Sequence, residues 1–92
     1  LGTVITFNQD DASNDGHPLI ITTDTSSPNS YIVSSGVVYY LDGTSTQSNY
    51  VNTTTFNAAT NRYVEWTPSA AGTYYYACYV HGIGMGGKIT IS

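Results

Sequence analysis

Basic side chains are almost missing from this chain. Only Arg62 and Lys88 are positively charged among 92 residues, against six acidic residues, and the formal net charge is −4. Binding to nucleic acid depends on clustered Lys and Arg side chains that neutralise phosphates, so this composition argues against a nucleic-acid partner. The same shortage argues against attachment to anionic membrane surfaces.

Long apolar runs and disulfide partners are missing as well. No stretch reaches the roughly 20 apolar residues of a membrane-spanning helix, so we expect no membrane span. The sequence starts without the basic and apolar regions of a secretory signal peptide. Cys78 is the single cysteine, so no internal disulfide forms, and the thiol is a buried small hydrophobe, a reactive group or a metal ligand.

The remaining composition predicts one small domain over residues 1–92, because this length leaves no room for two cores. No window repeats apolar residues at helical spacing, whereas short β-branched and aromatic runs alternate with turn clusters. Strands are predicted at residues 3–7, 19–23, 31–33, 37–41, 62–67, 73–79 and 88–91. We expect residues 44–61 to be a loosely structured excursion with room for one short strand. Seven to eight short strands predict an all-β protein, either a sandwich or a Greek-key barrel.

Ten residues near the end of the sequence, CYVHGIGMGG at positions 78–87, hold all of its sulfur and half of its imidazole. They include the only cysteine, the only methionine and one of two histidines. Cys78 ends a predicted strand, and we expect His81 and Met85 to follow on a glycine-rich loop. Glycine permits tight turns at little steric cost, and a loop supplies side chains from several directions.

Taken one at a time, these residues have ordinary structural explanations. A lone cysteine is most often a buried small hydrophobe, a methionine most often fills a core, and a turn histidine often makes one backbone bond. Period-two alternation places Tyr74, Tyr76 and Cys78 on one face of their strand. If that face points inward, Cys78 lies at the buried end of the strand, next to the predicted loop.

His17 is the other imidazole, and it lies far upstream between Gly16 and Pro18. Thiolate and thioether are soft donors, and imidazole suits copper. Two histidines and a cysteine in a trigonal arrangement, with a long axial methionine, are typical of a blue-copper electron-transfer site. Structural zinc sites, the main alternative, use cysteine, histidine and carboxylate rather than thioether. The donor set therefore favours copper.

Several stretches of the sequence together resemble one family. The segment GTYYYACYVH at 72–81, followed by MGGKI at 85–89, resembles the C-terminal part of the cupredoxins, which include plastocyanin, amicyanin, pseudoazurin and azurin. The preceding VEWTP at 64–68 fits the strand and turn before that motif, and GHPLII at 16–21 is similar to the first-histidine segment. A looser resemblance, in the low-charge body rich in Tyr, Thr and Asn, is to cupredoxin-like segments of marine phage structural proteins.

The resemblance implies a cupredoxin-like Greek-key β-sandwich that holds one copper ion per chain. It implies that Cys78, His81 and Met85 are copper ligands, with His17 as the distant fourth. The implied function is one-electron transfer by Cu(II)/Cu(I) cycling, with a redox protein partner docking on an apolar face near His81. We expect a monomer in an extracellular, periplasmic or virion-associated location.

One departure and two alternatives accompany this interpretation. In family members the residue after the first histidine is commonly Asn, and the backbone N–H of this Asn donates to the cysteine sulfur. Here that position is Pro18, which has no N–H, so this hydrogen bond cannot form. The first alternative is a copper-binding accessory or structural domain of a larger extracellular or virion surface protein. The second is an enzyme, but a copper oxidase needs further histidines for a second copper centre, and no Ser-His-Asp or paired-carboxylate site is present. No catalytic residue is therefore predicted.

Overall fold

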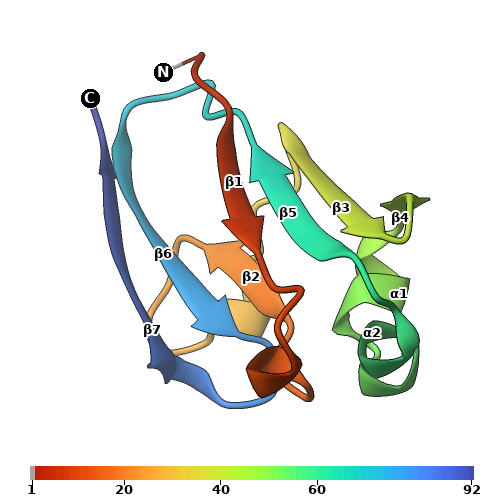
Figure 1. Cartoon of the computed structure of the whole chain (residues 1–92). Helices are drawn as coiled ribbons and strands as arrows, with labels where there is room; N and C mark the ends of the chain where they lie inside the picture. Colours follow the sequence, from red (N-terminus) through yellow and green to blue (C-terminus); the bar gives the residue numbers. More distant parts are fainter. Residues whose placement is uncertain (1) are drawn as a thin grey trace.

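The computed structural model describes residues 2–92, which form two antiparallel sheets that face each other (Figure 1). The first sheet has the order β1-β5-β3-β4. Its strands are β1 (Ile5–Asn8), β3 (Val37–Leu41), β4 (Thr44–Ser45) and β5 (Arg62–Trp66). The second sheet has the order β2-β6-β7. Its strands are β2 (Leu19–Thr22), β6 (Gly72–Cys78) and β7 (Gly82–Ile91). The predicted all-β class is confirmed at the level of two packed sheets.

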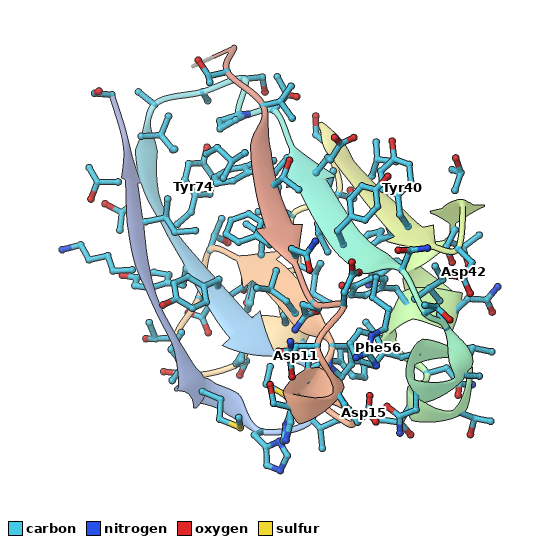
Figure 2. All side chains as sticks on the ribbon, in the orientation of Figure 1. Asp11, Asp15, Tyr40, Asp42, Phe56 and Tyr74 are labelled. Carbon is cyan, nitrogen blue, oxygen red and sulfur yellow. The ribbon has the colours of Figure 1, made fainter. Side chains whose placement is uncertain are left out.

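The core lies between the sheets and is rich in aromatic residues. Strand β5 alternates strictly, so that Val64 and Trp66 are buried while their neighbours are half-exposed. Tyr74, which points into the space between the sheets (Figure 2), packs its ring edge-on against Trp66 at 4.8 Å between centroids. Tyr76 reaches Phe7 of the first sheet at 6.4 Å. These contacts between the sheets confirm that Tyr74 and Tyr76 share the inward face of β6.

Residues 44–61 differ from the prediction, because they contain two short helices. Helix α1 (Gln47–Val51) and helix α2 (Thr53–Ala58) follow the two-residue strand β4. Each helix starts at a capping side chain that accepts a backbone N–H, and each buries one aromatic residue completely, Tyr50 and Phe56. The two rings meet edge-on at 5.1 Å. The segment is therefore held by aromatic anchors in the core. Within residues 2–92, no helix is long and apolar enough to cross a bilayer.

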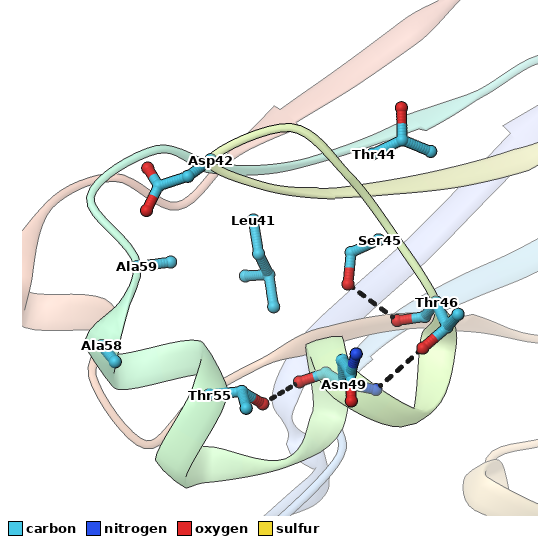
Figure 3. A pocket seen from close by; sticks show the side chains of 9 residues that line it. All are labelled: Leu41, Asp42, Thr44, Ser45, Thr46, Asn49, Thr55, Ala58 and Ala59. Carbon is cyan, nitrogen blue, oxygen red and sulfur yellow. Dashed lines mark hydrogen bonds between the residues drawn. The ribbon is translucent and has the colours of Figure 1, made fainter.

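The two helices and the β3–β4 hairpin enclose an open pocket of about 550 Å³ (Figure 3). Its polar side chains largely bind the chain itself. Thr46 accepts the N–H of Asn49, Thr55 donates to the carbonyl of Asn49, and Asp42 accepts backbone N–H groups of residues 60 and 61. These bonds stabilise the excursion.

Two predicted strands have different bounds in the structure. Residues 31–33 form only one isolated bridge, between Ile32 and Thr22, and do not form a strand. Strand β7 begins at Gly82 rather than at Lys88, so the predicted glycine-rich loop is largely strand. Its register with β6 shifts between two pairs, Cys78 with Gly82 and Tyr76 with Gly87. Residues 83–86 therefore lie opposite Ala77 alone, as a bulge that contains Met85.

Candidate metal centre

The β6–β7 hairpin holds two of the predicted ligands close together. Strand β6 ends at Cys78, three turn residues follow, and Gly82 begins β7 with φ +74°. Three-residue hairpin loops commonly end with a residue in this left-handed region, where glycine has no steric cost. Cys78 is 3% exposed, His81 at the turn is exposed, and the Cys78 Sγ lies 3.4 Å from the His81 Nδ1.

His17 reaches the same place from the start of β2, which is the other neighbour of β6 in the second sheet. Strand β2 pairs with β6 so that Leu19 lies opposite Cys78, which puts His17 two residues beyond the pair. Gly16, at φ +78°, reverses the chain just before it, and the His17 N–H donates to the Asn14 carbonyl at 2.8 Å. The Tyr79 N–H donates to the Pro18 carbonyl at 2.9 Å and ties this segment to the hairpin.

The turn before His17 is stabilised by an acidic side chain. It includes a short 3₁₀ helix, η1 (Ala12–Asn14), for which Asp11 is the N-cap residue. The Ser13 backbone N–H donates to the Asp11 carboxylate and, as the main cause, holds the pKa of Asp11 below its usual value. The carboxylate therefore keeps its charge, and this hydrogen bond, to lower pH than an ordinary aspartate would.

Three donor atoms form a compact triangle. The Nδ1 of His17 lies 3.1 Å from the Nδ1 of His81 and 3.7 Å from the Sγ of Cys78, and the third edge is 3.4 Å. A triangle with these edges has a circumscribed radius of about 2.0 Å, close to the metal–nitrogen and metal–sulfur bond lengths of about 2.0–2.3 Å in proteins. Both histidines present the same ring nitrogen. The predicted gathering of His17, Cys78 and His81 is confirmed, and the three residues lie close enough to bind one metal ion.

Met85, the fourth predicted ligand, borders the same place. Its side chain helps to line a cavity of about 180 Å³ together with His17, Cys78 and Tyr76. The β7 bulge carries it there, and it remains 47% exposed. Its thioether as the axial ligand stays a prediction.

Two buried polar residues beside the site were missed from the sequence. Gln9, 7% exposed, binds the backbone on both sides of Pro18, and Arg62, 2% exposed, binds the turn that precedes His17. Arg62 carried a signal, because alternation places it on the same face as the buried Val64 and Trp66. A buried charged side chain must be paired or hydrogen-bonded, so an arginine on that face predicts several hydrogen-bond acceptors around its guanidinium. Gln9 carried no comparable signal.

Comparison of the chain with protein-family models, curated proteins and solved structures finds no match. The function proposed below therefore depends on the residues of the chain and on the geometry of the donor triangle.

Proposed function

We propose that the chain is a type 1 (blue) copper protein of the cupredoxin family, with a Greek-key arrangement of its strands. It carries one electron by Cu(II)/Cu(I) cycling at His17, Cys78, His81 and Met85. The observation that supports the proposal is the triangle of two Nδ1 atoms and one Sγ atom, with a thioether beside it. This donor set suits copper, because thiolate and thioether are soft and imidazole binds copper well.

The backbone around the donors suits electron transfer. Cys78 and His81 are fixed by one tight hairpin, and His17 is fixed by β2 pairing and by main-chain hydrogen bonds. Donors held in this way move little when copper changes its oxidation state, so the reorganisation energy of electron transfer is small. When bound, copper supplies the one-electron couple. The chain keeps Cys78 buried and leaves His81 exposed at the surface.

The exposed surface around His81 suits a redox protein partner. Val80 is 54% exposed and Met85 is 47% exposed, and Ile83 lies between them in the chain. None of the residues from 79 to 87 is charged. Docking at this face depends on apolar contact, so its rate depends only weakly on salt. We propose a monomer in an extracellular, periplasmic or virion-associated location.

A copper titration of the reduced apo protein tests the proposal. We expect one equivalent of Cu(II) to produce an intense blue absorption and an EPR spectrum with a narrow copper hyperfine splitting. Cys78→Ser is the matched control: it retains a polar side chain of similar size but loses the blue colour, because the colour arises from thiolate-to-copper charge transfer. A wild-type protein that stays colourless or gives a wide hyperfine splitting contradicts the proposal.

A further inference from the structure

One buried amide, that of Gln9, holds the backbone on both sides of Pro18. Its Nε2 donates to the His17 carbonyl at 2.8 Å, and its Oε1 accepts the Leu19 N–H at 2.9 Å. Pro18 has no backbone N–H, so it cannot donate a hydrogen bond to an adjacent strand or to any other group. The Gln9 side chain therefore supplies the contacts that fix the chain direction at the point where His17 enters the site.

Gln9 is itself fixed by buried partners from both the first sheet and α1. Its backbone N–H donates to the Arg62 carbonyl at 2.7 Å, and its own carbonyl accepts the Arg62 Nε at 2.8 Å. The hydroxyl of the fully buried Tyr50 donates to the same Oε1 at 2.7 Å. The amide has one orientation that satisfies all these bonds, because its NH₂ group must face the His17 carbonyl.

Arg62 extends this network to the whole turn before His17. Its guanidinium donates to the carbonyls of Asp10 and Asp11 and to the Asp15 carboxylate at 2.5 Å. It also lies over the Phe56 ring, 4.5 Å from the centroid. Figure 2 shows Asp11, Asp15 and Phe56 gathered at the end of the molecule where η1 lies. The turn is therefore packed onto a buried cation, with Gln9 between that cation and His17.

We propose that Gln9 is a positioning residue for the metal centre. Its amide holds the His17 backbone so that the Nδ1 lies at the third corner of the donor triangle. This inference rests on the proposed function, and it assigns to Gln9, directly after β1 of the first sheet, a role in setting the geometry of ligands that adjoin the second sheet. Metal sites typically lose about 10- to 100-fold in affinity when an outer contact that orients a ligand is removed.

The test compares Gln9→Met with wild type and with Gln47→Met. Methionine matches the length of glutamine but makes none of its three side-chain hydrogen bonds. Gln47 is the only other glutamine, in α1 away from the donor triangle. We expect Gln9→Met to bind Cu(II) about 10- to 100-fold more weakly in competition with a chelator and to show a changed copper hyperfine splitting. In the apo protein, the Leu19 amide should exchange its hydrogen faster. Gln47→Met should match wild type in all three measurements.

Val64→Ala is a control that distinguishes the loss of His17 positioning from a general loss of stability. It opens a cavity in the core without removing any contact of Gln9, so it should lower the unfolding midpoint and leave the copper spectrum unchanged. If Gln9→Met does not fold, Gln9→Glu takes its place. A carboxylate at residue 9 keeps the acceptor for Leu19 and Tyr50 but has no donor for the His17 carbonyl, and we expect it also to weaken copper binding.

The outcomes distinguish this inference from the proposed function. A blue wild type, together with a folded Gln9 variant of unchanged affinity and spectrum, overturns the positioning role alone. A wild type without a type 1 spectrum overturns the proposed function. In that case Co(II) affinity and Leu19 amide exchange still decide whether Gln9 positions His17, because neither depends on copper chemistry. Equal values in Gln9→Met and wild type would then overturn the inference as well.

Discussion

Gly86 lies in the β7 bulge beside Met85, and the structure leaves no room for a side chain there. A Cβ built on Gly86 would lie 1.9 Å from the Tyr76 carbonyl oxygen and 2.9 Å from the Ala77 Cα. Both contacts are with backbone, which cannot move aside as a flexible side chain does. Gly86→Ala must therefore push β7 away from β6 at the point where the bulge begins.

The size of the effect follows from this geometry. Overpacking a well-packed site costs about 1–3 kcal/mol, and a collision with backbone belongs at the upper end of that range. Alanine also restricts the unfolded chain, which offsets about 0.4–1 kcal/mol. We therefore expect Gly86→Ala to lower the free energy of unfolding by about 2–3 kcal/mol. For a domain of this size that loss lowers the midpoint of thermal unfolding by roughly 10–20 °C.

Gly84→Ala is the matched control for thermal and urea unfolding followed by circular dichroism. Gly84 lies in the same bulge, and a Cβ there meets nothing within 4 Å. We expect Gly84→Ala to unfold within a few degrees of wild type. Equal midpoints for the two variants would refute the bulge geometry. With copper bound, Gly86→Ala should also change the visible spectrum, because it displaces the neighbouring Met85, whereas Gly84→Ala should change it less.

Three further predictions concern the axial ligand, the apo fold and alkaline stability. Met85→Gln should retain copper and lower the reduction potential, because a harder oxygen ligand stabilises Cu(II); an unchanged potential measured by redox titration would count against axial Met85. Removal of copper by a chelator should leave the β-sheet circular dichroism intact, because Cys78 is the only proposed ligand in the buried core formed by residues 2–92; loss of the signal would contradict this. Burial raises the pKa of Tyr39 to about 12, so the folded state holds this proton more tightly than the unfolded state. The resulting stability is complete below pH 10 and should fall by roughly 2–3 kcal/mol as the pH rises to 12. Urea unfolding across this range should show a smaller decrease for Tyr39→Phe, and equal decreases would argue against the buried tyrosine as the cause.

The sequence predicted the parts of the fold that depend on local pattern. The runs at β2, β3 and β5 combine β-branched and aromatic residues with turn signals at their ends, and their observed bounds lie within a residue or two of the prediction. The Asp42–Gly43 pair, a sequence typical of hairpin turns, closes the β3–β4 hairpin. The sequence grouped Cys78 and His81 because such residues are rare in this chain. His17 was added to the donor triangle as the only other imidazole and through the resemblance to the cupredoxins.

The sequence could not predict features that depend on distant contacts. Helices of five and six residues are too short to form alone, so α1 and α2 exist because Tyr50 and Phe56 are buried and Arg62 lies over the Phe56 ring. The bulge in β7 depends on its register with β6, which no local pattern encodes. The contact of Gln9 with His17 depends on how the two sheets pack together.

Copper-edge X-ray absorption of the copper-loaded protein tests the central claim most directly, because it reports the donor atoms themselves. The proposed site predicts one short copper–sulfur distance from Cys78 and the multiple-scattering pattern of two imidazoles, from His17 and His81. The short sulfur distance should vanish in Cys78→Ser, and one imidazole should be lost in His17→Gly. A spectrum with only nitrogen and oxygen neighbours in the wild type would contradict the account. It would make a copper-binding structural domain the better interpretation of the chain.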